Sequence, residues 1–581
     1  MESFIDFVTD DLIIDCVCRK RASEAAKRHG QHHFHAISSD YRISNPSHIV
    51  YELTPPRRQW IHVGERGRTA PLPGGIKQTI PTAERTYRSV LWTVLRDKKN
   101  GVQRPYLRKL NSFIEEVKQR IQAPDYAIKT PRTIPIFKKK GNPDVFRPIC
   151  LFEDLADSII IILANRYLSR LFDVYFYEDS LAFRPKRYFH GKRITTFHHE
   201  AIALISQYLE RNNSRNVYVA ECDMQKFYDT VDHSIVRYEY NRLIEKARTD
   251  NPGVSFDDIT RVFYSYLDCY TFTDNVWKKN HEPEYWAQHH IQRGEFGWVK
   301  VYQKQANSKK AKMPQLGVPQ GGALSGLIAN IVINRVDECI KPGLHPGNDL
   351  YVRYCDDMLL LSTNKKRCRR LFRLYTRQIK DAKLIPHPSI TPSFGTGEYW
   401  DTKSKNVYKW ISEGKESGSK WIGFVGYEMS RDGSIRIRKN SLRKEKRKQK
   451  RVVSELFNLT YQKKRVNNSS MELSYRNTMI SMAVGRATLW NYTTLKNEYC
   501  WANGFRMLND NPIATTQIRD LDRCRNRIIH RANERLKRLV STVGGTIAKE
   551  GNNKRNSKIE SSLTYYGKPF SYYYHYKKNC H

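Results

Sequence analysis

Three carboxylates in two short segments are the residues best suited to chemistry. Asp356 and Asp357 stand side by side in YVRYCDDMLLLS, between residues that otherwise read as a buried strand. Asp223 follows NVYVAEC, whose alternation predicts a strand that ends at the aspartate. Carboxylate oxygens suit Mg²⁺, and two such ions can stabilise the attacking and leaving oxygens of a phosphoryl transfer. An isolated Asp-Asp pair is common, so the prediction of a metal site depends on all three.

A glycine-rich turn lies between the two carboxylate segments. In QLGVPQGGALSGLIANIVINRV, glycines from Gly317 to Gly322 precede apolar positions that recur at helical spacing, beginning at Leu324. Glycine lets a backbone approach a base or sugar closely, and the Gln320 amide can hydrogen-bond there. A plain junction between a loop and a helix is the alternative, but it leaves the position between the carboxylates unexplained.

The charge balance indicates a polyanionic partner. The chain of 581 residues has 100 Lys and Arg against 59 Asp and Glu, a net charge of +41, with 12% aromatic residues. Lys and Arg that neutralise phosphates release condensed counterions, which favours nucleic acid over a small acidic substrate. The segment 436–451, RIRKNSLRKEKRKQKR, is the most basic run and precedes a helical pattern. We expect it to contact nucleic acid, and a solvated helix face is the alternative.

Several other classes are disfavoured by composition. Eleven scattered cysteines predict reduced thiols in the cytoplasm, and the spacing of Cys16 and Cys18 to the nearby histidines fits no standard zinc pattern. The longest aliphatic run, 159–164, is too short to span a bilayer, and the acidic N-terminus lacks the features of a signal peptide. We therefore expect neither secretion nor membrane insertion.

The ordered motifs resemble those of reverse transcriptases, particularly the bacterial group II intron-like lineage. CDMQKFYDTVDH, GVPQGGALSGLIANI and YCDD look like motifs A, B and C; IPIFKKKGNPDVFRPI and SLAFRPKR look like fingers motifs; FVGYEMSRDGSIRIRKNSLRK is similar to the primer grip and the start of the thumb. The resemblance covers about 130–445. It implies an α+β right-hand polymerase fold with a helical N-terminal extension at 1–125, fingers and palm at 126–430, and a basic helical thumb and C-terminal region at 431–581. The segment 238–314 matches nothing in the family and is expected to be an insertion.

The resemblance also implies an activity and its partners. These are an RNA-directed DNA polymerase with two Mg²⁺ ions (Mn²⁺ as the alternative ion), an RNA template, a DNA primer or product, and dNTPs. Asp223 and Asp356 become the principal metal ligands, Asp357 the companion carboxylate, and the Met224 carbonyl a further ligand. Tyr228 falls where the family carries the aromatic gate against a ribose 2′-hydroxyl; a core aromatic is the alternative. Asp229 and Asp232 are expected to cap or pack.

Further site residues follow from the fingers, primer-grip and thumb motifs. The dNTP-binding set is Tyr228, Gln320, Lys138, Lys140 and Arg147. Arg147 and the lysines 138–140 would offset triphosphate charge, and ordinary surface charge is the alternative for the lysines. The primer grip comprises Phe424, Gly426 and Tyr427. Nucleic-acid contacts are expected from Arg184, Arg443, Lys444, Lys446, Arg447 and Lys448, although for Arg184 a structural role is an equal alternative.

Departures from the family pattern mark positions of interest. Ser325-Gly326 replaces the usual Ser-Pro, Ala182 replaces a glycine, and His387 lies where many relatives have a lysine. We hypothesise that His387 is a general acid for the leaving pyrophosphate, with a surface histidine as the favoured alternative.

The biological setting is inferred by elimination. The chain lacks the Cys- and His-bearing endonuclease cluster that an intron-encoded maturase often carries after its thumb, and the Val-Thr-Gly signature expected of retron enzymes. Diversity-generating enzymes usually replace the Pro-Gln-Gly turn with a Ser-Gln form, whereas Pro319-Gln320-Gly321 is intact here. This leaves a stand-alone antiphage-defence enzyme that uses a bound noncoding RNA; a group II intron-type maturase and a non-catalytic RNA-binding scaffold are the alternatives. Tyr572, Tyr573 and Tyr574 are candidate protein primers, with aromatic packing as the favoured alternative. A homo-oligomer or a second subunit is left open.

Overall fold

The computed structural model describes most of the chain, in two compact units. The described residues are 1–37, 42–43, 48–63, 69–71, 77–79, 82–137, 145–184, 188–189, 192–193, 198–308, 312–391, 393–394, 397–412, 417–461, 505, 507–509, 511–543, 570–571 and 574. One unit comprises Met1–Ile13, Asn111–Val425 and Arg431–Gly433, and the other comprises Ile14–Leu110, Gly426–Ser430 and Ser434–His581. The predicted boundaries at 125 and 430 stay predictions.

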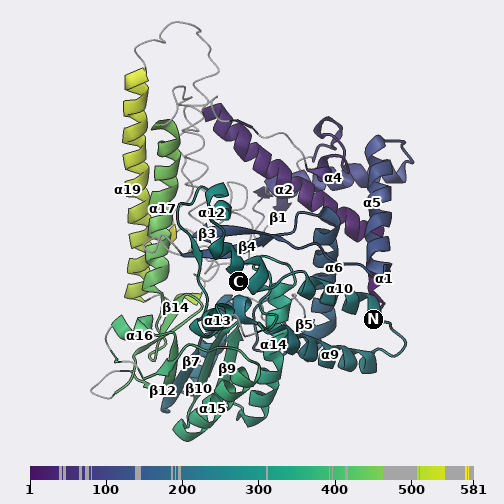
Figure 1. The fold of residues 1–581 in the computed structure, drawn as a ribbon. Helices are drawn as coiled ribbons and strands as arrows, with labels where there is room; N and C mark the ends of the chain where they lie inside the picture. The colour runs from purple at the N-terminus through teal and green to yellow at the C-terminus, as the bar shows by residue number, and fades with distance from the viewer. Residues whose placement is uncertain are drawn as a thin grey trace. The chain divides into compact units, whose positions relative to one another are not determined.

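A five-stranded sheet forms the centre of the first unit. Its order is β11-β12-β7-β10-β9, with every pair antiparallel except β11 and β12. The strands are β7 (Val217–Cys222), β9 (Asp349–Tyr354), β10 (Asp357–Ser362), β11 (Ser389–Ile390) and β12 (Ser404–Trp410). Helix α15 (Lys365–Asp381) packs against β7, β10 and β12, and α14 (Ser325–Ile340) packs on α15 (Figure 1).

Local sequence explains both helices. In α15, Asn364 caps the first turn by accepting from the Arg367 amide at 2.9 Å, and residues such as Leu371 and Tyr375 place one apolar stripe on the sheet. Helix α14 is apolar on nearly all sides, from Leu327 to Ile340, because it is enclosed by other elements. These two helices and the sheet make a continuous core beneath the β9–β10 hairpin.

A second sheet, β3-β4-β8, carries the sequence of the predicted fingers motifs. Strands β3 (Arg132–Phe137) and β4 (Val145–Leu151) are antiparallel, and β8 (Glu295–Phe296) pairs in parallel with β4. Strand β8 belongs to the segment 238–314, so this expected insertion completes the sheet. The other elements of this unit are α1 (Phe4–Phe7), α6 (Leu155–Phe172), η3 (Asp173–Tyr175), β5 (Tyr188–Phe189), β6 (Lys192–Arg193), α7 (His198–Arg211), α8 (Phe227–Thr230), α9 (His233–Asp250), α10 (Asp257–Asp268), α11 (Phe272–Asn275), η4 (Trp277–His281), α12 (Pro283–Gln288), α13 (Lys300–Ala306), η5 (Lys341–Gly343), α16 (Gly397–Asp401) and β13 (Trp421–Phe424).

The second unit is mainly helical. Its long helices α17 (Lys439–Tyr461) and α19 (Pro512–Val543) lie side by side (Figure 1), and α19 also packs on β15 (Ile435–Ile437), the partner of β14 (Tyr427–Ser430). The unit also contains η1 (Ile49–Tyr51), η2 (Arg57–Gln59), β1 (Thr69–Pro71), β2 (Lys77–Thr79) and α4 (Thr82–Lys99), while α2 (Asp10–Ile37) and α5 (Pro105–Gln122) contribute residues to both units. The architecture confirms the predicted α+β class. Among the helices in the described part of the chain, none combines the length and apolar character needed to cross a membrane.

Candidate active site

The β9–β10 hairpin and strand β7 bring the three aspartates together. Tyr354 pairs with Asp357, so Cys355 and Asp356 form a two-residue hairpin loop, in which Cys355 has a φ of 59°. Met358 on β10 lies opposite Cys222 on β7, and the next step of this register places Asp223 opposite Asp357. Asp356 therefore lies in the loop of a tight hairpin, and Asp357 is the first residue of its second strand.

The three carboxylates differ in environment. Asp356 is half-buried, and burial together with the nearby Asp223 raises its pKa above the ordinary value. Asp357 is exposed. Burial raises the pKa of the Cys222 thiol to about 12, and all three aspartates reinforce this shift. The carboxylates therefore share one neighbourhood in which adding further negative charge is unfavourable.

A lysine that no motif indicated neutralises part of this charge. Lys403 Nζ lies 2.6 Å from Asp223 Oδ2, and its positive charge offsets part of the rise in the pKa of Asp356. The ammonium group shows that the carboxylate pair attracts a cation, and the donor set of carboxylate oxygens is the one that Mg²⁺ prefers. Asp223 and Asp356 thus fit the divalent ions that the sequence predicts.

The backbone of Asp223 is held from two further segments. The Asp223 amide donates to Ser404 Oγ at 3.0 Å, and this hydroxyl donates back to the Asp223 carbonyl at 3.3 Å. The His387 amide donates to the same carbonyl at 2.8 Å. His387 therefore lies beside the site, although the side chain that reaches the Asp223 carboxylate is that of Lys403. The general-acid role of His387 stays a hypothesis.

Tyr228 lies against the hairpin loop. Its hydroxyl is 3.3 Å from Cys355 Sγ, and its carbonyl accepts from the Val318 amide at 2.8 Å. Tyr228 is half-buried whereas the adjacent Phe227 is 3% exposed, so the core-aromatic alternative describes Phe227 better. Burial, reinforced by Cys355, raises the pKa of Tyr228, which keeps its hydroxyl protonated. The gate role stays a prediction.

The glycine turn is tied to its neighbours by Gln320. The Gln320 side-chain amide donates to Asp229 Oδ1 at 2.5 Å, and the backbone carbonyl of Gln320 accepts from the Cys150 backbone amide at 2.8 Å. Asp229 is 1% exposed, and Asp232 accepts from the Ser234 amide to cap α9, so they are packing and capping residues as predicted. Nucleotide binding by Gln320 stays a prediction, and one of its donors already has a protein acceptor.

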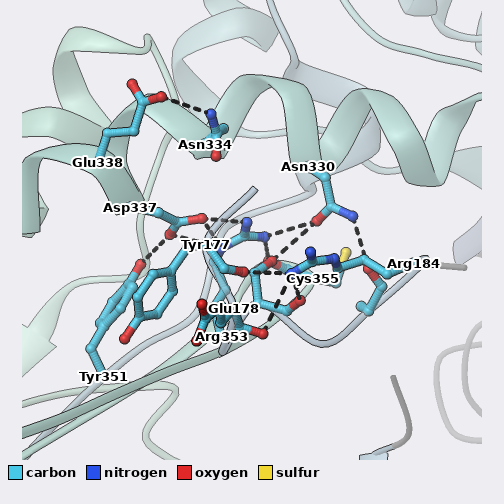
Figure 2. A network of polar contacts seen from close by, with 12 residues as sticks. Tyr177, Glu178, Arg184, Asn330, Asn334, Asp337, Glu338, Tyr351, Arg353 and Cys355 are labelled. Carbon is cyan, nitrogen blue, oxygen red and sulfur yellow. Dashed lines mark hydrogen bonds and ion pairs between the residues drawn. The ribbon is translucent and has the colours of Figure 1, made fainter. Parts of the chain in front are cut away.

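A buried ion pair lies beneath the hairpin (Figure 2). Arg353 and Asp337 have fully buried side chains, with Nη2 at 2.6 Å from Oδ2 and Nε at 3.0 Å from Oδ1. Arg353 Nη1 donates to the Cys355 carbonyl at 2.8 Å and to Asn330 Oδ1 at 3.2 Å, while the Tyr351 hydroxyl donates to Asp337 at 2.6 Å. The pair joins α14 to the loop that carries Asp356. Its only sequence signal is a charged residue between apolar ones in YVRY.

Arg184 is also buried rather than presented to a ligand. Its Nε contacts Asp173 Oδ1 at 2.5 Å, both side chains are 1% exposed, and its Nη1 donates to the Tyr177 carbonyl at 2.6 Å (Figure 2). Of the two roles left open for Arg184, this geometry favours the structural one, because a buried guanidinium with these partners does not reach a template.

The remaining fingers and primer-grip residues are partly described. Arg147 is exposed on β4, whereas Lys138, Lys139 and Lys140 lie outside the described residues. Phe424 ends β13 and Tyr427 begins β14; both are buried, and Gly426 in the intervening turn has a φ of 91°. Their roles at a triphosphate and a primer stay predictions.

The basic run forms part of α17. Arg443, Lys444 and Arg447 are exposed, whereas Lys446 lies 3.2 Å from Asp520 and Lys448 lies 3.7 Å from Glu445. The first three are thus the better candidates for nucleic-acid contact.

The tyrosine-rich tail is described at few positions. Tyr574 is 2% exposed, which favours the packing alternative over a priming role. Tyr572 and Tyr573 lie outside the described residues.

Comparison with known proteins identifies the domain. Residues 136–389 match the family model for "Reverse transcriptase (RNA-dependent DNA polymerase)". The match, together with the α+β architecture, confirms the predicted polymerase fold and the enzyme class of RNA-directed DNA polymerase. The match does not identify a bacterial lineage within the family.

Two solved telomerase structures show a distant likeness. A telomerase from Candida albicans, solved with a TWJ fragment of telomeric RNA, has a TM-score of 0.33 and 13% identity, and the alignment covers 80% of this chain and 75% of that one. Apo telomerase from Candida tropicalis has a TM-score of 0.32 and 11% identity, with 83% and 72% covered. Similarity this low carries no argument about function. No curated protein matches the chain.

Proposed function

We propose that this chain, whose residues 136–389 match the reverse transcriptase family, adds dNTPs to a primer 3′-hydroxyl on an RNA template by two-metal phosphoryl transfer. The observation that carries the proposal is the placement of Asp356 at a hairpin loop beside Asp223, close enough for Asp223 to raise the pKa of Asp356. Two carboxylates this close repel each other, and bound cations reduce that repulsion.

Each side chain at the site then has a distinct part. Asp223 and Asp356 would hold the divalent ions, which stabilise the charge on the attacking and leaving oxygens. Asp357 and the Met224 carbonyl are the further donors that the family resemblance implies for these ions. Tyr228 crowds the sugar of the incoming nucleotide, and exposed Arg147, with the lysines at 138–140, offsets triphosphate charge.

Lys403 is the counter-charge of the site before the ions bind. Its ammonium lies 2.6 Å from the Asp223 carboxylate, and its side chain is 62% exposed. Because an exposed lysine on a flexible stem gains little from a single ion pair, a divalent ion with stronger attraction can displace it. Lys403 therefore lowers the repulsion between Asp223 and Asp356 without blocking the site.

The biological role within this proposal is antiphage defence with a bound noncoding RNA. The net charge of +41 supports a long nucleic-acid partner, and a group II intron-type maturase is the alternative among enzymes. A non-catalytic RNA-binding scaffold is the alternative from another class, and the presence of all three aspartates favours the enzyme. Sequencing of the RNA and DNA that co-purify with the chain, together with phage plating, tests this role.

A primer-extension assay tests the chemistry. The purified full chain is incubated with an RNA template, a DNA primer, dNTPs and Mg²⁺, alongside Asp356→Asn, Asp223→Asn and the control Glu245→Gln, whose side chain is 66% exposed on α9. Wild type and the control should extend the primer, and each aspartate variant should lose about 10²-fold or more, as expected for removal of a preorganised electrostatic group. Absence of DNA from wild type on this template and on its co-purifying RNA would favour the scaffold.

A further inference from the structure

Phe183 is a bulky aromatic residue in a conformation that such residues rarely adopt. Its φ is 58°, in the left-handed region, and 54% of its surface is exposed. Left-handed backbone is unfavourable for a large side chain and persists only where the surroundings impose it. An exposed phenylalanine also loses the benefit of burial. Both costs point to a use for the ring outside the folded core.

The residues on both sides of Phe183 impose this conformation. The Asn330 side-chain amide donates to the Ala182 backbone carbonyl at 2.8 Å, and the Leu181 backbone amide donates to the Arg353 backbone carbonyl at 2.9 Å. On the other side, Arg184 is held in its buried pair with Asp173. Figure 2 shows Asn330, Arg184 and Cys355 in one polar network. The backbone at Phe183 is thus fixed by the same network that holds the loop of Asp356.

A glycine provides the seat for the ring. An ideal Cβ at Gly326 would lie 2.6 Å from Phe183 Cγ and 2.7 Å from Cδ1, so the ring rests directly on the backbone in the first turn of α14. The reverse transcriptases that the sequence resembles usually have proline here, which could not accept the ring in this place. The glycine at position 326, in place of the usual proline, and the left-handed conformation of Phe183 are therefore parts of one local arrangement.

We propose that Phe183 is a stacking platform for a nucleobase, from the template strand or from the incoming nucleotide. The proposal rests on the proposed function. One side of the ring is seated on Gly326, the remainder is exposed, and the platform stands where α14 begins, directly after the glycine turn. Aromatic rings accept any base because every base has a π-face. The platform therefore predicts tighter binding without sequence preference.

Five variants and one control test the platform. Phe183→Ala should weaken binding of the stacked base by about 5- to 150-fold, the range for removing one aromatic stack. Phe183→Trp should retain binding, and Phe183→Leu, which is apolar but has no π-face, should behave like Phe183→Ala. Gly326→Ala leaves Phe183 in the chain but displaces its ring, so it should reproduce the loss, and the double variant Phe183→Ala/Gly326→Ala should be no worse than either. Tyr238→Ala is the matched control, since Tyr238 is an aromatic with 55% exposure on α9.

Two readouts distinguish the source of the base and separate this proposal from the proposed function. The Kd of an RNA–DNA primer-template with 2-aminopurine at the first unpaired template position reports template stacking without catalysis. The KM for dNTP reports stacking of the incoming base. Melting temperatures of the Phe183 single variants should match wild type within about 1 °C, because truncation of an exposed side chain costs little stability. Wild-type Kd and KM in Phe183→Ala, or in Phe183→Leu, would overturn the platform while leaving the polymerase intact. A Phe183-dependent Kd in a chain that makes no DNA would keep the platform and overturn the polymerase.

Discussion

Replacing Asp337 by Asn should destabilise the first unit because it strands a buried charge. Asp337 and Arg353 are both 0% exposed, and the guanidinium of Arg353 directs Nε and Nη2 at the Asp337 carboxylate. Asp337→Asn keeps the size of the side chain but removes the negative charge. Arg353 then remains in the core without a counter-charge, since Asn330 and the Cys355 carbonyl are neutral acceptors.

The size of the effect follows from burial. Breaking a buried ion pair by removing one partner costs about 3–5 kcal/mol. With about 2 cal/mol/K of unfolding entropy per residue and about 330 residues in this unit, the melting temperature should fall by about 4–7 °C. The exposed pair Arg248–Glu245, with side chains 46% and 66% exposed, is worth well under about 1 kcal/mol, so Glu245→Gln should shift the melting temperature by about 1 °C or less.

Thermal unfolding of the full chain, followed by calorimetry, measures both variants. A third variant, Arg353→Met/Asp337→Leu, replaces the pair by apolar side chains and should recover most of the lost stability, because it removes the stranded charge. A melting temperature of Asp337→Asn equal to that of wild type would refute the cost of the stranded charge. A double variant less stable than Asp337→Asn would refute it as well. The double variant should still lose activity, since it lacks the donor to the Cys355 carbonyl.

Three more predictions concern the surroundings of the site. Tyr228→Ala should raise ribonucleotide incorporation relative to dNTP by about tenfold or more, as judged by the ratio of kcat/KM values, and an unchanged ratio would exclude the gate. Lys403→Met should move the acidic limb of the pH–rate profile to higher pH, because Lys403 lowers the pKa of Asp356, which must be ionised to hold a cation; an unmoved limb would contradict this. Burial raises the pKa of Asp179 from 3.8 to about 6, so the folded chain holds this proton more tightly and stability should fall as pH rises from about 4 to about 6. The fall is at most about 3 kcal/mol and smaller with solvent screening, and Asp179→Asn should remove it in melting curves across this window.

Much of the catalytic geometry could be predicted because it is local. The alternation before Asp223, the apolar flanks of the Asp-Asp pair and the glycine turn each have a period or composition that specifies one element, and all three elements form as expected. The capping role of Asp232 follows from its place before a helix. Such features depend on a few neighbouring residues.

The rest depends on contacts between distant residues. Lys403 lies 180 positions from Asp223, and nothing in its local sequence indicates an ion pair. From the sequence alone, Arg353 resembles an outward-facing charge in a strand. Its partner Asp337 is on α14, which the local sequence of the strand does not indicate. The seat of Phe183 requires Gly326, which is recognisable as a departure but not as a contact. Strand β8 has two residues, too few for a period.

Addition of a single dNTP to an RNA-templated primer under single-turnover conditions measures directly whether Asp356 acts in phosphoryl transfer. Wild type and Asp356→Asn are compared at saturating dNTP and Mg²⁺, with primer-template binding measured in parallel. If Asp356 holds a catalytic ion, both proteins should bind the primer-template equally, and Asp356→Asn should add the dNTP at a rate at least about 10²-fold lower. Addition at the wild-type rate by Asp356→Asn would contradict this role.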